Sequence, residues 1–148
     1  MKESKIIAIT GSSGFVGSNL IQRLKDQGYY VYGIDIQAPK YTEPDNFTLG
    51  DLRDPMVCEK FCSQPFVQVF TFAADMGGAF HIFTGDNDAD IMHNSALINL
   101  NVAHYATLAG VRQLFYSSSV CAYSQKQALN KIPEEAIYPA NPDSNYGW

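Results

Sequence analysis

Short, continuously apolar segments recur along this 148-residue chain, and helical patterns or loops separate them. The segments are Lys5–Ile9, Tyr30–Ile34, Phe47–Leu49, Phe66–Phe72 and Gln113–Ser117. They lack the polar–apolar alternation of half-exposed strands, which is typical of strands covered on both faces. Strands of this kind joined by helices form parallel sheets, so the sequence predicts an α/β fold with a doubly wound parallel sheet. Ligands of such sheets bind outside the carboxyl ends of the strands.

Three helices are predicted between these segments. Gly14–Gln27 carries apolar side chains at helical spacing and is followed by Gly28, which favours a helix end. A short helix opens at Asp54-Pro55, because Asp caps free N–H groups and Pro suits the first helical position. The third runs from Ile91 to about Ala109 and carries no charge but several polar side chains. That pattern is typical of a helix buried in a protein or at a subunit interface, not of a lone membrane span.

The composition excludes several classes of protein. With 46% hydrophobic and 17% charged residues, the chain is neither disordered nor a charged tail. Its formal net charge of -5 and pI of about 5.0 argue against a nucleic-acid partner, which would favour a basic surface. Three cysteines rule out a complete disulfide framework, and no signal peptide is visible. We therefore expect a cytoplasmic protein with reduced thiols and no membrane partner.

No metal site is expected. Cys58 and Cys62 stand four residues apart on the short predicted helix without other ligand residues nearby, which favours packing. His81, His93 and His104 show no ligand spacing. The acidic loop ahead of the third helix lacks the glycine and glutamate of a calcium loop, so its Asp residues are interpreted as helix-capping and solvent-exposed.

A glycine motif follows the first apolar segment. Gly11, Gly14 and Gly17 form the pattern G-x-x-G-x-x-G, placed between the first predicted strand and the first predicted helix. In that context glycines permit a tight turn and the close approach of a pyrophosphate, which binds at the helix N-terminus. The motif therefore predicts a Rossmann-type dinucleotide site, and the alternative is an ordinary strand-to-helix turn.

Polar or small residues also follow the next three strands. Asp35 can accept hydrogen bonds from the hydroxyls of a ribose and repel a 2′-phosphate, and no Arg follows it closely, which favours NAD over NADP. Asp51 and the backbone N–H of Leu52 can bind the edge of an adenine. The small pair Ala73-Ala74 lets a cofactor lie across the strand ends. As alternatives, Asp35 is a turn residue, Asp51 caps a turn and the alanines serve packing.

A run of hydroxyl side chains ends the fifth strand. Ser117 to Ser119 lead to Cys121, and Tyr146 lies near the end of the chain. A hydroxyl there can orient a substrate hydroxyl, and a tyrosine becomes a base when a nearby cation lowers its pKa. The Lys that would share a helix face with Tyr146 falls at position 150, beyond Trp148. By position alone, a small buried hydrophobe is the favoured interpretation of Cys121.

Together these residues resemble the extended short-chain dehydrogenase/reductases, the nucleotide-sugar epimerase/dehydratase family. The resemblance rests on the glycine motif, the acidic residues after the strands, the Ser run and Tyr146. Within the family, Ala73–Gly78, Ile91–Asn94 and Ser118–Tyr123 are similar to the GDP-mannose 3,5-epimerases. The resemblance covers nearly the whole chain.

The resemblance implies a set of residues that bind NAD. Those expected at the pyrophosphate are Gly11, Gly14, Phe15, Val16 and Gly17. Those expected at the adenosine half, or lining the cofactor at the strand ends, are Asp35, Asp51, Leu52, Ala73 and Ala74. Those expected at the nicotinamide half are Asn94, Ser117 and Tyr146.

The resemblance also implies catalytic and substrate-binding residues. The implied substrate is a nucleotide sugar. The residues implied to face it are Gly77, Gly78, Ser119 and Cys121. Tyr146, Cys121 and Ser119 are the expected catalytic residues: the tyrosine accepts a hydroxyl proton, and the cysteine exchanges ring protons. The hydride that NAD takes is returned, so NAD is not consumed.

The expected function is therefore that of an NAD-dependent nucleotide-sugar epimerase, with residues 1–148 as its incomplete NAD-binding domain. The catalytic Lys, the second acid/base residue and the C-terminal substrate domain are expected after residue 148, so the chain alone is expected to be inactive. A full-length form is expected to be a homodimer. The alternatives are a related dehydratase or 4-epimerase, a non-catalytic NAD-binding module, and a structural partner of a full-length homologue.

Overall fold

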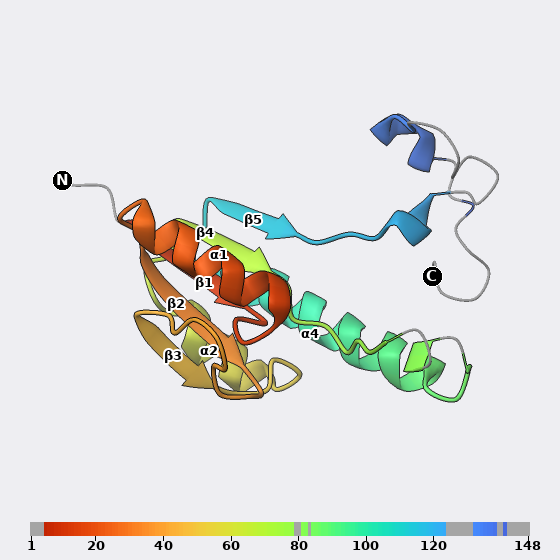
Figure 1. Ribbon diagram of the computed structural model, residues 1–148, viewed down its shortest axis with the longest axis horizontal. Helices are drawn as coiled ribbons and strands as arrows, with labels where there is room; N and C mark the ends of the chain where they lie inside the picture. The colour runs from red at the N-terminus through yellow and green to blue at the C-terminus, as the bar shows by residue number, and fades with distance from the viewer. Residues whose placement is uncertain (1–4, 79–80, 83, 124–131, 139–140, 142–148) are drawn as a thin grey trace. The chain divides into compact units, whose positions relative to one another are not determined.

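The computed structural model describes residues 5–78, 81–82, 84–123, 132–138 and 141 (Figure 1). The chain divides into two compact units. The first, which we call the sheet unit, comprises residues 1–74 and 94–116. The second unit comprises residues 75–93 and 117–148.

A five-stranded parallel sheet, in the order β3-β2-β1-β4-β5, forms the centre of the sheet unit. Its strands are β1 (Ile6–Thr10), β2 (Tyr30–Asp35), β3 (Asn46–Leu49), β4 (Gln68–Thr71) and β5 (Gln113–Tyr116). The predicted doubly wound parallel sheet is confirmed. The fourth strand is shorter than its apolar segment at both ends, and the fifth ends one residue earlier than predicted, because these terminal residues lie in the connecting segments.

Each face of the sheet has its own core, because successive side chains of a strand point to opposite faces. On one face, Ile7 and Ile9 of β1 pack with Ile21 and Leu24 of α1 (Phe15–Asp26). On the other face, Ala8 packs with residues of α2 (Pro55–Cys62) and α4 (Asp88–Leu108). Figure 1 shows α1 in front of the sheet and α2 behind it. The continuous apolar pattern of the strands follows from this double cover.

The helix ends agree with local sequence signals. Asp54 accepts a hydrogen bond of 2.8 Å from Met56 N ahead of Pro55, as the sequence predicts. α1 ends before Gly28, whose φ of 82° suits a glycine. α4 begins at Asp88, not at Ile91, because acidic side chains are favourable in the first turn of a helix. Within the described ranges, no helix is long and apolar enough to cross a membrane.

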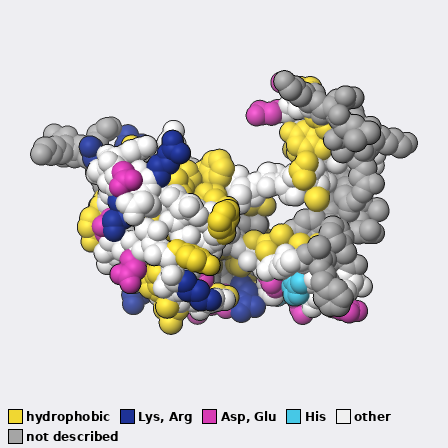
Figure 2. All heavy atoms as spheres, viewed as in Figure 1, with side chains coloured by type: hydrophobic (Ala, Val, Ile, Leu, Met, Phe, Trp, Pro, Cys, Tyr) yellow, Lys and Arg dark blue, Asp and Glu magenta, His cyan; other side chains and the backbone are white. Residues whose placement is uncertain are grey.

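Apolar side chains also reach the surface of the sheet unit. Leu114, Phe115 and Tyr116 of β5 are exposed, and Figure 2 shows hydrophobic side chains gathered on the viewed face around β5. In the second unit, the described residues include the first turns of α4 and two 3-10 helices, η1 (Val120–Ala122) and η3 (Glu134–Ile137).

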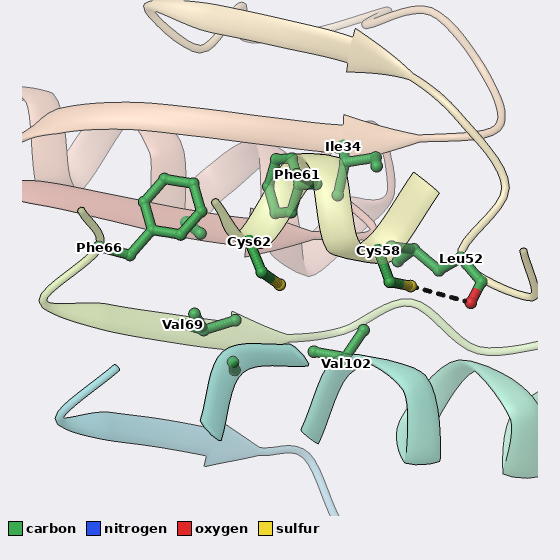
Figure 3. Packing of buried hydrophobic residues seen from close by; sticks show 10 residues of the cluster. Ile34, Leu52, Cys58, Phe61, Cys62, Phe66, Val69 and Val102 are labelled. Carbon is green, nitrogen blue, oxygen red and sulfur yellow. Dashed lines mark hydrogen bonds between the residues drawn. The ribbon is translucent and has the colours of Figure 1, made fainter. Parts of the chain in front are cut away.

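The two cysteines of α2 lie in the core, which confirms the predicted packing role. Figure 3 shows Cys58 and Cys62 among Phe61, Val69 and Val102. The Sγ of Cys58 donates a hydrogen bond of 3.2 Å to the backbone oxygen at residue 52. Burial raises the pKa of Cys58 to about 12 and that of Cys62 to about 11. Both side chains are therefore neutral thiols at physiological pH.

These pKa values predict a selective thiol reaction. At pH 8, iodoacetamide should modify Cys121, which is half-buried, and leave Cys58 and Cys62 unmodified, because the thiolate is the reactive form. Mass spectrometry of tryptic peptides measures each site separately. In denaturing urea all three cysteines should react. Native modification of either α2 cysteine as fast as Cys121 would contradict the buried positions.

Candidate functional site

The carboxyl ends of the parallel strands meet at one edge of the sheet, and the predicted site residues of the sheet unit follow them there. The turn after β1 is bonded to the ends of both neighbouring strands. Gly11 N donates to Ile34 O of β2 at 2.9 Å, and Ala73 N, just after β4, donates to Thr10 Oγ1 at 3.3 Å. Ala73 is half-buried and Ala74 is exposed. The structure thus brings the glycine motif and the alanine pair together.

Two of the three glycines are required by the geometry of this turn. Gly11 has a φ of 68°, and a Cβ there would lie 2.7 Å from Ala73 N. A Cβ at Gly17 would collide with the carbonyl oxygen of Gly11 and lie 2.9 Å from Ser12 Cα. Gly14 is less constrained, since its Cβ would lie 3.3 Å from the same carbonyl oxygen. The turn therefore brings backbone close to backbone, as the glycine motif predicts.

The N-terminus of α1 follows directly and is suited to an anion. No side chain caps this helix end at Gly14, and its first turn holds no acidic residue. The first N–H groups of a helix have no partner within the helix, and its dipole is positive at this end. Phe15 and Val16, which lie in this turn, are 82% and 54% exposed. A phosphate could therefore approach the backbone here.

Asp35, at the end of β2, is bonded to the glycine turn. Its Oδ2 accepts from Ser13 N and its Oδ1 from Gln37 N, both at 3.0 Å. Ser13 Oγ donates to Gln37 O at 2.7 Å, so the two loops are tied together around the carboxylate. A carboxylate can accept about four hydrogen bonds, so Asp35 can accept more from a ligand. The carboxylate thus lies beside the glycine turn.

Asp51 follows β3 and forms an ion pair that the sequence analysis did not single out. Arg53 Nη2 lies 2.6 Å from Asp51 Oδ2, and Arg53 Nε and N also donate to this carboxylate. These hydrogen bonds from Arg53 lower the pKa of Asp51. The sequence did offer one indication of this ion pair, because Arg53 stands two residues after Asp51. Arg53 Nη1 also donates to Asn94 Oδ1 of α4 at 3.2 Å, so Asn94 joins the group.

Leu52 differs from its neighbours because its side chain belongs to the core. Only 3% of Leu52 is exposed. Its carbonyl oxygen accepts from Asn101 Nδ2 of α4 at 3.0 Å, and Asn101 also donates to Arg53 O at 3.0 Å. Asn101 was not predicted, because the contact joins residues distant in the sequence. Only the backbone of Leu52 is therefore placed to contact a ligand.

The other predicted site residues belong to the second unit. Ser119 is the N-cap of η1, and its Oγ accepts from Cys121 N at 3.1 Å, so these two residues share one turn. Gly77 packs against His81: a Cβ on the glycine would lie 2.6 Å from the imidazole. Ser117 and Gly78 are both exposed. Tyr146 lies outside the described residues.

Two further observations concern the chemistry of the site. Among the residues the structure describes, no group of three or more His, Cys, Asp and Glu side chains could hold a metal ion. The side-chain donors and acceptors at the sheet edge are carboxylates, an amide, a guanidinium and hydroxyls. Such a set, next to an uncapped helix end, suits a polar organic ligand that carries phosphate.

Comparison with known proteins gives consistent matches. The model of the "NAD dependent epimerase/dehydratase family" matches residues 7–148. GDP-mannose 3,5-epimerase 1 of Oryza sativa subsp. indica is 36% identical over 148 residues, which cover 95% of this chain and 38% of the rice protein. The chain thus spans about two fifths of the length of this relative.

Solved structures match the fold closely. UDP-glucose 4-epimerase of Thermotoga maritima, determined with UDP-glucose, aligns with a TM-score of 0.80 at 25% identity, over 96% of this chain and 46% of that one. The Bordetella bronchiseptica enzyme WbmG, determined in complex with NAD and UDP, aligns with a TM-score of 0.74 at 28% identity, over 95% and 45%.

Proposed function

Because this chain belongs to the NAD dependent epimerase/dehydratase family, we propose that it is the cofactor-binding part of an NAD-dependent nucleotide-sugar epimerase. The observation that carries the proposal is the hydrogen bond between Asp35 Oδ2 and Ser13 N, within the glycine turn. This contact supports the proposal because the Asp35 carboxylate, which would accept from the ribose, lies beside an uncapped helix N-terminus. NAD is the cofactor in the family's name.

The residues fit this cofactor in three places. A side chain at Gly11 or Gly17 would collide with backbone atoms, so glycine at these positions keeps the turn tight. In a tight turn a pyrophosphate could approach the helix end and contact the N–H groups at Gly14, Phe15 and Val16. Asp35 would accept hydrogen bonds from the ribose hydroxyls. Asp51 and the Leu52 N–H would bind the adenine, Ala73 and Ala74 would line its path, and Ser117 and Tyr146 would contact the nicotinamide half. Asn94, expected from the sequence at the nicotinamide half, is bonded to Arg53 and would lie at the adenine end.

We propose that Tyr146, Cys121 and Ser119 carry the proton transfers. NAD, when bound, takes a hydride from the sugar and later returns it. Tyr146 would accept the hydroxyl proton, Ser119 would orient that hydroxyl, and Cys121 would exchange a ring proton. Gly77 and Gly78 would face the sugar. The shared turn of Ser119 and Cys121 supports this assignment.

The proposed substrate is a nucleotide sugar of the GDP-mannose type, because the rice relative is 36% identical across almost the whole chain. A second candidate is 4-epimerisation of a UDP-sugar, favoured by the fold match with the Thermotoga maritima enzyme. We propose that residues 1–148 form the NAD-binding domain. A homodimer is also proposed, because α4 exposes Met92, Leu100 and Leu108.

Cofactor preference tests the proposal directly. By calorimetry, NAD should bind at least about tenfold more tightly than NADP, because the 2′-phosphate would lie against the Asp35 carboxylate. Asp35→Asn removes this charge and should narrow the difference to about threefold or less. Asp26→Asn, at an exposed carboxylate near the end of α1, is the matched control and should change nothing. Equal or tighter binding of NADP by the unaltered chain would overturn the proposal.

A further inference from the structure

Arg53 makes an unusually complete set of bonds to one carboxylate. Its Nε lies 3.0 Å from Asp51 Oδ1 and 2.9 Å from Oδ2, its Nη2 lies 2.6 Å from Oδ2, and its backbone N donates to Oδ1 at 2.9 Å. A guanidinium and a carboxylate are both planar, so contacts along one edge of each fix the orientation of both groups. The Asp51 carboxylate is therefore held in one orientation by three donors, because Nε is shared between its two oxygens, and one acceptor position is left for a ligand.

The other end of the guanidinium is held by α4. Arg53 Nη1 donates to Asn94 Oδ1 at 3.2 Å, and Asn101 donates to the backbone oxygens of Leu52 and Arg53 at 3.0 Å each. Asn94 and Asn101 are seven residues apart, so they lie two turns apart on one face of α4. The turn after β3 is thus attached to α4 through both its backbone and the Arg53 side chain.

Folding stability does not account for this arrangement. The side chains of Arg53 and Asp51 are 45% and 40% exposed, and ion pairs exposed to this degree add little to stability. The core beneath them includes Leu52, of which only 3% is exposed. A bidentate ion pair in such a place has its main effect on what Asp51 can bind.

We propose that Arg53 is a positioning residue of the dinucleotide site, which orients the Asp51 carboxylate so that it accepts the amino group of an adenine. This inference rests on the proposed function, because it needs a dinucleotide at the sheet edge. Arg53 does not contact the base: it acts through Asp51 and is braced by Asn94. The lowered pKa of Asp51 has the same cause and keeps the acceptor ionised.

Nicotinamide hypoxanthine dinucleotide tests the inference. It differs from NAD only in the base, where a carbonyl replaces the amino group and N1 carries a hydrogen, so donor and acceptor are exchanged. An oriented Asp51 carboxylate should bind NAD about tenfold more tightly than this analogue, which is the effect of one charge-assisted hydrogen bond. A merely structural contribution of Arg53 would alter the affinity for both dinucleotides equally.

Three variants of the whole chain are compared by calorimetry. Arg53→Met keeps an unbranched apolar stem, removes the guanidinium and should reduce the preference for NAD to about twofold or less. Arg53→Lys keeps the charge without the bidentate contact and should give an intermediate preference. Arg23→Met, at an exposed arginine of α1, is the matched control and should keep the full preference. Circular dichroism establishes that each variant is folded.

Each outcome separates the inference from the proposed function. If the unaltered chain does not bind NAD, the proposed function fails. If the chain binds NAD and the hypoxanthine analogue equally, Arg53 is not a positioning residue, although the chain still has an NAD site. The same holds if Arg53→Met keeps the full preference for NAD over the analogue. Asp51→Ala serves as reference, since it removes both carboxylate oxygens and should abolish the preference. If Arg53→Met does not fold, an unchanged preference in Arg53→Lys overturns the inference.

Discussion

Replacing Gly17 by alanine is expected to destabilise the chain by about 3 kcal/mol and to abolish NAD binding. The added Cβ would collide with the carbonyl oxygen of Gly11 and lie 2.9 Å from Ser12 Cα. Both contacts are with backbone, so no side-chain rotation relieves them. The turn must therefore open, and the N–H groups at the start of α1 must move with it. Urea denaturation measures the first effect and calorimetry the second.

Gly28→Ala is the matched control for this experiment. Gly28 has a φ of 82°, but nothing lies within 4 Å of the Cβ it would gain. The substitution therefore tests backbone strain alone, which costs about 1 kcal/mol, and should leave NAD binding intact. If Gly17→Ala and Gly28→Ala were equally stable and both bound NAD, the close approach at Gly17 would not matter for function.

Phe61→Ala is expected to reduce the free energy of unfolding by about 3 to 5 kcal/mol, as for other buried aromatic residues. Only 4% of Phe61 is exposed, and its ring lies 5.3 Å from that of Phe66. The cavity would open in the core between α2 and the sheet (Figure 3). Urea denaturation monitored by circular dichroism measures the change.

Met56→Ala provides the comparison on the same helix. Met56 is 69% exposed, so removing its side chain should change the free energy of unfolding by about 0.5 kcal/mol or less. A loss of similar size in the two variants would contradict the packing role of Phe61, because alanine has the highest helix propensity and neither loss could come from that source. The difference between the two variants is therefore the measure of the core contact.

The sheet and the glycine turn could be predicted because both depend on local sequence patterns. Continuous apolar segments predict buried parallel strands, and a glycine motif between a strand and a helix predicts the turn that the structure contains. Asp54-Pro55 likewise predicted the start of α2, since a capping residue and a proline act over a few residues. The position of Asp35 followed from the rule that β2 ends next to the turn after β1.

Contacts between distant segments could not be predicted. Arg53 meets Asn94 across 41 positions of sequence, and Asn101 meets Leu52 across 49. Such contacts depend on the rotation of α4 about its axis, and this helix has polar side chains around much of its circumference. Its start at Asp88 was also missed, because an acidic loop and an acidic first turn have the same composition.

The central position of β1 has a consequence for synthesis of the protein. Its neighbours are β2, where Ile7 pairs with Val31, and β4, where Ile7 pairs with Gln68. At about 5 to 20 residues per second, the second neighbour follows the first strand from the ribosome only after several seconds. Until then the backbone N–H and C=O groups on that edge of β1 have no permanent partner. The strand that is synthesised first is thus paired on its second edge late. During this interval the nascent chain is exposed to chaperones and to aggregation.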